Sequence, residues 1–330
     1  IYVTQGRAAI QPTVALSYNS SSPNGFAGVG WSLDLGKIGR STKYGAPQYT
    51  NSDKFVLIQN KSQQELVDIS GNATQFCPEI EAAFMKIEFI NNTYWLVTDR
   101  KGIKYYFGQT DSTRTFDPSN SNKVFEWLLD RVEDLSGNYL VVSYIKHVNQ
   151  NYPEKIEYTG NSQNNLSFFA KVEFEWEART DVMSSYKSKF FIGTQKRLSC
   201  IYIYADGVLQ RKYKISYSQS FMTERSLLTS IVQYGADGIY SLTPTTFVYQ
   251  QGDAGMRFIY NSYSSQREVV DELARFVPRN QPTNVIVYGG TAGALDYYAR
   301  SRGIELNLMY FRFASDTQPE KFLLDQKIKF

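Results

Sequence analysis

Short strand-like segments separated by turn residues recur from the start of the chain to about residue 249, and this pattern constrains the fold most. Residues 84–90, 94–97 and 103–107 alternate in polarity and are joined by the short turns Asn91-Asn92 and 99–102. Loops of this length join antiparallel neighbours. Aromatic residues make up 15% of the chain, and such side chains suit pleated, half-buried surfaces. The pattern predicts a mainly β fold of antiparallel meanders and hairpins in stacked or curved, shell-like sheets.

Further strand pairs follow at similar spacing. We predict strands at 125–131, 139–145, 153–158, 171–176, 198–204, 208–217, 227–234 and 245–249. The turn between 204 and 208 contains Asp206-Gly207, which is a strong hairpin signal. A turn is also predicted at Thr159-Gly160-Asn161, where the strand at 153–158 would end.

A glycine-rich run extends from Leu16 to Leu35. It begins within a predicted strand at 13–18 and contains a dense turn cluster at 19–25, followed by Gly28-Val29-Gly30-Trp31. Glycines spaced by two beside a tryptophan indicate close backbone approach within or next to a strand.

The pattern of apolar and polar residues changes after Gly252. Residues 266–276 and 294–301 have the spacing of helices, whereas 284–288 and 304–313 are apolar and strand-like. The order helix, strand, helix, strand is typical of an α/β segment. We therefore predict a β domain at 1–251 and a smaller C-terminal α/β segment at 252–330. The abrupt strand-like beginning and end predict that the chain is a fragment of a longer one.

Charge and hydropathy exclude several classes of protein. The chain has 35 basic and 32 acidic residues, a net charge of +3, and the two signs are interspersed. This pattern does not favour nucleic-acid binding, and no apolar run approaches the roughly 20 residues of a membrane-spanning helix. Cys77 and Cys200 could pair, but a stapled scaffold would carry more cysteines, so two free thiols are favoured.

Candidate catalytic groups are sparse. His147 is the single histidine, and no cysteine or carboxylate stands at metal-ligand spacing from it. Glu173, Glu175 and Glu177 alternate along one predicted strand and would share a face. A Glu-x-Glu pair with an upstream Arg and a Ser-Thr-Ser strand resembles ADP-ribosyltransferase toxins. Arg40-Ser41-Thr42 matches in part, but Lys43 stands in place of the second serine. A charged outer sheet face explains the glutamates equally well.

Gly289-Gly290-x-x-Gly293 lies between a predicted strand and a predicted helix. It resembles a dinucleotide-binding turn, but its spacing differs from G-x-G-x-x-G, and Glu305 is too near to be the usual acidic residue. Tight packing of a helix on a strand is the favoured interpretation. The sequence thus predicts no catalytic, cofactor-binding or metal-binding residue, no cofactor and no enzyme activity in this chain.

The glycine-rich run and later pieces, taken in order, resemble the domain shared by the Salmonella plasmid virulence protein SpvB and the B components of insecticidal toxin complexes. The pieces are 16–20, 24–25, 28–33, 38–40, 53–57, Trp95, 99–108, 127–134 with 137–138 and Tyr144, 179–182, 184–186, 196–198, 228–234 and 245–249. Residues 132–144 also resemble a tyrosine-rich repeat of Rhs proteins. The resemblance covers about residues 1–250.

The resemblance implies a function. It indicates a structural shell or scaffold module of a secreted, extracellular bacterial toxin that helps to encapsulate or deliver a C-terminal toxic domain. The implied partners are other toxin subunits or the remainder of its own chain, namely a propeller, an Rhs shell and a C-terminal cargo, with no nucleic acid and no direct membrane insertion. An ADP-ribosyltransferase-type toxin component and a glycan- or surface-binding module are the alternatives. Exposed edge strands also predict self-association of the isolated chain.

Overall fold

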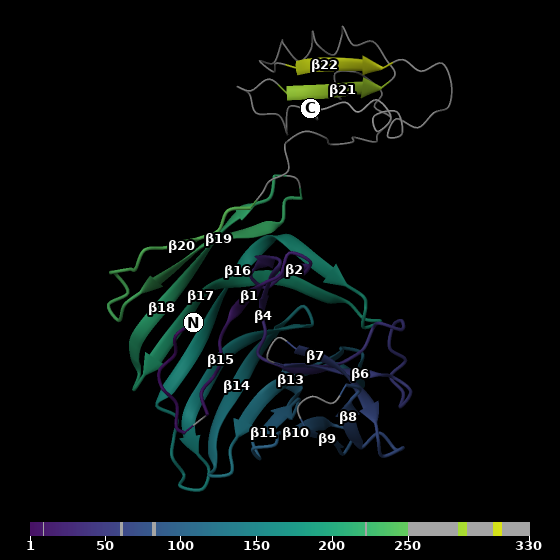
Figure 1. Cartoon of the computed structure of the whole chain (residues 1–330), viewed down its shortest axis with the longest axis vertical. Helices are drawn as coiled ribbons and strands as arrows, with labels where there is room; N and C mark the ends of the chain where they lie inside the picture. The colour runs from purple at the N-terminus through teal and green to yellow at the C-terminus, as the bar shows by residue number, and fades with distance from the viewer. Residues whose placement is uncertain are drawn as a thin grey trace. The chain divides into compact units, whose positions relative to one another are not determined.

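The computed structural model describes residues 1–249, apart from 9, 60, 61, 81–83 and 222, together with the backbone of two strands, 283–288 and 306–311 (Figure 1). The chain divides into two compact units, Ile1–Tyr249 and Gln250–Phe330. No helix among the described residues is long and apolar enough to cross a membrane.

Eight strands of the first unit close into a barrel, because the last strand of the series, β13, pairs with both β5 and β11. The barrel consists of β5 (Lys37–Arg40), β6 (Phe55–Gln59), β7 (Ser62–Asp68), β8 (Gln75–Pro78), β9 (Lys86–Ile90), β10 (Tyr94–Thr98), β11 (Lys104–Phe107) and β13 (Asn120–Glu133). Every pairing in it is antiparallel. The short 3-10 helix η1 (Asp111–Thr113) and the strand β12 (Arg114–Asp117) precede β13, and β12 pairs with its first half.

Aromatic side chains fill the barrel. Side chains of β9 and β10 alternate between buried and partly exposed, as a sheet with one face on a core requires. Trp95 and Trp127 are almost completely buried, and the Phe89 ring stacks on Trp95 with centroids 4.5 Å apart. Phe55 packs edge-on against Trp95. The predicted meander of residues 84–107 is confirmed as β9, β10 and β11.

Beyond β13 the sheet continues as an antiparallel meander that we call the open sheet. Its strands are β14 (Asn138–His147), β15 (Gln150–Asn161), β16 (Ala170–Ser185), β17 (Ile192–Ala205), β18 (Val208–Gln219), β19 (Ser226–Tyr234) and β20 (Thr245–Thr246). The hairpin predicted at Asp206-Gly207 is confirmed. Both turn residues have positive φ, 49° and 76°, as a two-residue type I′ turn requires.

Two predicted strands extend past the C-terminal ends expected for them. Strand β15 runs through Thr159-Gly160-Asn161, where a turn was expected, because Thr159 adopts a positive φ of 80° and the register shifts there. The turn-forming residues thus form a β-bulge inside the strand. Strand β16 continues past Trp176 to Ser185, because residues 183–185 pair again with β17 after a second register shift.

Residues 1–35, which we call the strap, lie along the open sheet (Figure 1, purple). The strap contains two small antiparallel pairs, β1 (Leu16–Tyr18) with β4 (Trp31–Leu33) and β2 (Asn24–Gly25) with β3 (Gly28–Val29). Its first residues bind two strands of the sheet. The backbone N–H of Tyr2 donates to the Tyr213 hydroxyl at 3.1 Å, and the Tyr158 hydroxyl donates to the carbonyl of Thr4 at 2.9 Å. The strap therefore contacts both β18 and β15.

In the second unit, β21 (Thr283–Tyr288) and β22 (Leu306–Phe311) pair in parallel. They correspond to the strands predicted at 284–288 and 304–313. The helices predicted at 266–276 and 294–301 and the turn Gly289–Gly293 lie outside the described residues.

Candidate functional site: a buried clasp between the strap and the open sheet

A large bulge interrupts the pairing of β16 with β17. Ala178 pairs with Lys196 and Met183 pairs with Thr194, so the four residues 179–182 oppose Gln195 alone. Extra residues in one strand bend it and re-aim its side chains. Here Arg179, which is 4% exposed, and Asp181 meet the strap hairpin β2–β3.

Arg179 forms a bidentate ion pair with Asp181. Its Nε and Nη2 atoms lie 2.9 Å from Oδ1 and Oδ2 of the carboxylate, and the two side chains are 0% and 6% exposed. The same guanidinium donates from Nη1 to the carbonyl of Gly25 at 3.0 Å and from Nη2 to Asn24 Oδ1 at 2.9 Å. Planar, bidentate pairing of this kind fixes orientation as well as charge. The buried cation thus holds the strap hairpin.

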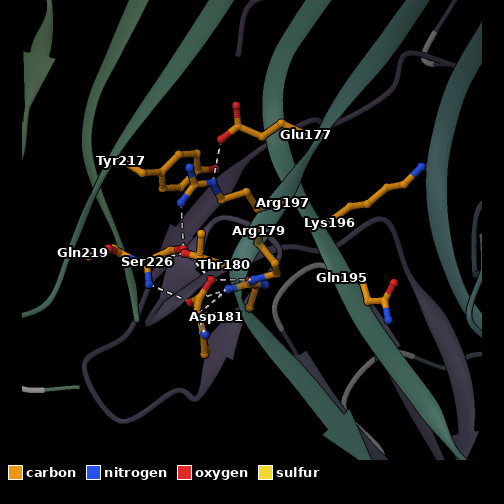
Figure 2. Close-up of polar contacts among 12 residues, drawn as sticks. Glu177, Arg179, Thr180, Asp181, Gln195, Lys196, Arg197, Tyr217, Gln219 and Ser226 are labelled. Carbon is orange, nitrogen blue, oxygen red and sulfur yellow. Dashed lines mark hydrogen bonds and ion pairs between the residues drawn. The ribbon is translucent and has the colours of Figure 1, made fainter. Parts of the chain in front are cut away.

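Asp181 connects the same hairpin to β19. It accepts hydrogen bonds from the backbone N–H and the hydroxyl of Ser226, both at 2.7 Å, and from Asn24 Nδ2 at 2.8 Å. Burial acts to raise the pKa of Asp181, but the bonds from Arg179, Ser226 and Asn24 outweigh it and hold that pKa well below its usual value. We call Asn24, Arg179, Asp181 and Ser226 the clasp. Figure 2 shows Arg179, Asp181 and Ser226 converging.

Arg197 on β17 extends the clasp toward solvent. Its Nε atom donates to Glu177 Oε1 at 2.6 Å and its Nη1 atom to Ser226 Oγ at 2.9 Å, while its guanidinium lies 4.3 Å from the centroid of the Tyr217 ring. Figure 2 shows Lys196, the preceding residue, directed away from this group. Arg197 therefore links four strands of the open sheet, β16, β17, β18 and β19.

The glycine-rich run is explained by close contact with this site. Gly28 has a φ of +92°, and a Cβ atom there would lie 2.5 Å from the carbonyl oxygen of Ser226. A Cβ atom on Gly25 would lie 2.1 Å from the carbonyl oxygen of Trp31. The close backbone approach predicted from the sequence is confirmed, and its partner in the sheet is β19.

A second contact holds the end of the first unit. Trp31 Nε1 donates to the Tyr249 hydroxyl at 2.7 Å, and that hydroxyl donates to the carbonyl of Leu228 at 2.8 Å. The Trp31 ring also packs edge-on against Phe247, with centroids 4.8 Å apart. We call Trp31 and Tyr249 the latch. Through it the strap fixes the last described residue before the second unit.

The residues considered for ADP-ribosyl transfer are not brought together. Arg40 lies in β5 and pairs with Asp53 at 2.7 Å. The three glutamates lie in β16, which follows β5, β13, β14 and β15 in the sheet order. At about 4.8 Å per strand, that is roughly 19 Å along the sheet.

The glutamates themselves have structural partners. Glu173 pairs with Lys171 at 2.5 Å, Glu175 accepts from the Tyr202 hydroxyl at 2.7 Å, and Glu177 binds Arg197. The register shifts between Glu175 and Trp176, which interrupts the alternation on which a shared face was predicted.

His147 and the cysteines have structural surroundings. His147 Nε2 lies 3.1 Å from Gln195 Oε1. Cys77 and Cys200 are both free, as the sequence favoured. Within the described part of the chain, no group of three or more His, Cys, Asp or Glu side chains is placed to hold a metal ion. The absence of catalytic and cofactor-binding residues stays a prediction.

Sequence reasoning missed the clasp as a unit. The pieces 24–25 and 179–182 were each noted, but Ser226 was not, and no local pattern connects residues this far apart. The available signal was the Arg-x-Asp spacing at Arg179 and Asp181, just after the strand predicted at 171–176, since two opposite charges on one face can pair.

A family model described as Salmonella virulence plasmid 65kDa B protein, SpvB, matches residues 1–171. The chain belongs to this family. A SpvB relative, the mono(ADP-ribosyl)transferase SpvB of Salmonella choleraesuis (strain SC-B67), is 29% identical over 187 residues, which cover 49% of this chain and 32% of the relative. The match therefore spans about a third of that relative's length.

Solved structures share the fold. The N-terminal domain of effector protein SpvB from Salmonella typhimurium strain LT2 matches with a TM-score of 0.61 and 19% identity, over 69% of this chain and 95% of that one. The TcdB2-TccC3 complex matches with a TM-score of 0.65 and 18% identity, over 77% of this chain and 16% of that one. The resemblance read from the ordered sequence pieces is thus confirmed.

Proposed function

We propose that this SpvB-family chain is a structural scaffold module of a secreted bacterial toxin, which helps to encapsulate or deliver a toxic domain carried elsewhere in the polypeptide or by a partner subunit. The clasp carries this proposal. Its ionised side chains, Arg179 and Asp181, form an ion pair with each other and hydrogen bonds with the strap and β19, so they serve to join strands. The fold shared with a SpvB N-terminal domain and with TcdB2-TccC3 supports the same role.

The proposed partners are other toxin subunits or the rest of the same polypeptide, including a propeller, an Rhs-type shell and a C-terminal cargo. The proposed location is outside the bacterial cell. Both proposals are supported by the identities of the matched proteins, an effector and a two-component complex. The proposed division into a domain at 1–251 and a segment at 252–330 would place the latch at the exit toward those parts.

The transferase activity named for the SpvB relatives is proposed to belong to the part of those proteins that this chain does not match. Calorimetric titration of the 330-residue chain with NAD tests this. We expect no saturable heat. Saturable binding with a micromolar dissociation constant would show that the chain itself takes part in nucleotide chemistry.

The scaffold role is tested in the parent polypeptide. An Asp181→Asn variant removes the negative charge that holds Arg179 and should loosen the strap. We expect the downstream region to become more sensitive to protease than in the unmodified parent, while an exposed Asp206→Asn variant behaves like the parent. If the open sheet is loosened in Asp181→Asn but the downstream region stays as resistant to protease as in the parent, this chain does not shield that region.

A further inference from the structure

Asn24 uses both ends of its side-chain amide in the clasp. Its Oδ1 atom accepts from Arg179 Nη2 at 2.9 Å, and its Nδ2 atom donates to Asp181 Oδ2 at 2.8 Å. An amide can donate to a carboxylate and accept from a guanidinium at the same time. A carboxylate at this position could accept from Arg179 but could not donate to Asp181. The clasp therefore requires an amide at position 24.

The next residue has to be glycine for a separate reason. Gly25 pairs with Gly28 in the strap hairpin, and its carbonyl accepts from Arg179 Nη1 at 3.0 Å. Because a Cβ atom on Gly25 would lie 2.1 Å from the carbonyl oxygen of Trp31, a larger residue would force the backbone to move. The two requirements together produce Asn24-Gly25, the single Asn-Gly dipeptide in the sequence.

An Asn-Gly pair can deamidate without a catalyst, because glycine has no Cβ atom to restrict the backbone or obstruct its nitrogen. In this reaction the Gly25 nitrogen forms a bond to Asn24 Cγ, the Cγ–Nδ2 bond breaks, and Nδ2 leaves as ammonia with the proton of the Gly25 N–H. Water then opens the succinimide ring. Cleavage of the new N–Cγ bond gives aspartate, and cleavage of the original peptide bond gives isoaspartate. Water is the only co-reactant.

The closed clasp opposes this reaction. Ring closure expels Nδ2 and draws Cγ toward the backbone, so the bonds of the Asn24 amide to Arg179 and Asp181 have to break. A group that reacts only after a segment opens is slowed by the small population of the open state. Asn24 should therefore deamidate slowly in the closed clasp and as fast as an unstructured Asn-Gly pair in a released strap.

The product would not fit the closed clasp. One cation, Arg179, balances one buried anion, Asp181, and the neighbouring Arg197 is held by Glu177. A new carboxylate would place a charged oxygen where Asn24 Nδ2 lies, 2.8 Å from Asp181 Oδ2. Like charges this close disfavour each other's ionised form. Isoaspartate would in addition insert a methylene group into the backbone of the hairpin. Either product should keep the clasp from closing again.

We propose that Asn24 is a covalent modification site, protected while the clasp is closed, whose deamidation after release of the strap makes that release permanent. The inference rests on the geometry of the clasp and not on the scaffold role. It adds a reactive residue to a chain for which the sequence predicts no catalytic, cofactor-binding or metal-binding one.

The first test follows conversion at position 24 by peptide mass spectrometry, in the full 330-residue chain at pH 8. We expect conversion to be at least about tenfold faster in guanidinium chloride than in the folded chain, since opening of the strap limits the reaction. Without denaturant, Arg179→Met should react faster than the wild type, whereas Arg100→Met, at an exposed turn position, should react like it. Equal wild-type rates with and without denaturant, or no conversion in denaturant, would overturn the proposal.

The second test measures what the product does to the clasp. Asn24→Asp makes one product directly, and Asn19→Asp is the matched control, because it adds the same charge at an exposed position of the strap. The readout is hydrogen exchange of the Ser226 amide, which donates to Asp181 Oδ2 at 2.7 Å. We expect roughly tenfold faster exchange in Asn24→Asp and wild-type exchange in Asn19→Asp. Equal exchange in the two variants would show that deamidation does not hold the clasp open.

Discussion

The barrel and the open sheet differ in how the backbone groups at their strand edges are satisfied. Each barrel strand has a neighbour on both sides, so its backbone groups are satisfied within the ring. The open sheet ends at the two-residue strand β20 and is held by the strap, through the clasp and the latch. Closure of a barrel leaves no unpaired edge strand, whereas the edge strands of an open sheet need to be covered by other parts of the chain.

The ion pairs of the two regions show the same contrast. Arg40 and Asp53 in the barrel are 13 residues apart in sequence, and the guanidinium also lies over the rings of Phe55 and Trp127. In the clasp, Arg179 reaches Asn24 across 155 residues, and Asp181 reaches Ser226 across 45. Long-range contacts close larger loops and form at a higher entropic cost. The open sheet therefore depends more on a few polar groups than the barrel does.

Arg179→Met should have the largest effect. It leaves the Asp181 carboxylate buried without its cation, and breaking a buried pair in this way costs about 4 kcal/mol. Urea unfolding of the full chain measures the loss. Arg100→Met, at an exposed turn position, should change stability by less than about 0.5 kcal/mol. Equal effects of the two variants would mean that the clasp does not hold the sheet.

Trp95→Leu probes the barrel. Trp95 is 0% exposed and contacts Phe55, Phe76, Phe89 and Trp127. Truncation leaves a cavity in a closed core, and we expect a loss of about 3 kcal/mol in the free energy of unfolding. The effect should appear in the same unfolding experiment. A loss below about 1 kcal/mol would indicate that the barrel is loosely packed.

Asp130 should make stability depend on pH. Burial raises its pKa from 3.8 to about 6, so the folded state binds the proton more tightly than the unfolded state. This contribution is fully present below about pH 4 and is lost as the pH rises through 6. The stability difference between wild type and Asp130→Asn should change by about 2–3 kcal/mol between pH 4 and pH 7. A pH-independent difference would show that burial does not raise the pKa of Asp130.

Gly28→Ala should destabilise the strap through strain and contact together. Its φ of +92° and the 2.5 Å approach of a Cβ atom to the Ser226 carbonyl predict a loss of about 2 kcal/mol. Gly207→Ala is the matched control, because Gly207 also has positive φ, +76°, but no atom lies within 4 Å of its Cβ position. A smaller loss in the control isolates the contact with β19, and identical losses would assign the whole effect to backbone strain.

The sequence predicted local structure better than it predicted contacts between segments that are far apart in the chain. Alternation and turn residues were sufficient for β9 to β11 and for the Asp206-Gly207 hairpin, because the signals lie within a few residues. The bulges at Thr159 and at 179–182 depend on partner strands and were missed. Barrel closure by β11 and β13 and the bond from Asp181 to Ser226 join segments far apart in sequence, which single-sequence patterns do not encode. The ordered family pieces indicated the fold without these contacts.

Hydrogen exchange in the wild type and in Arg179→Met tests the role of the clasp most directly. Backbone amides of β18 and β19 should exchange faster in the variant, while those of β9 and β10 in the barrel keep their protection, because the clasp holds the open sheet and the barrel closes on itself. A uniform increase across both regions would show that the two form one cooperative unit. No increase in β18 and β19 would show that the open sheet stands without the clasp.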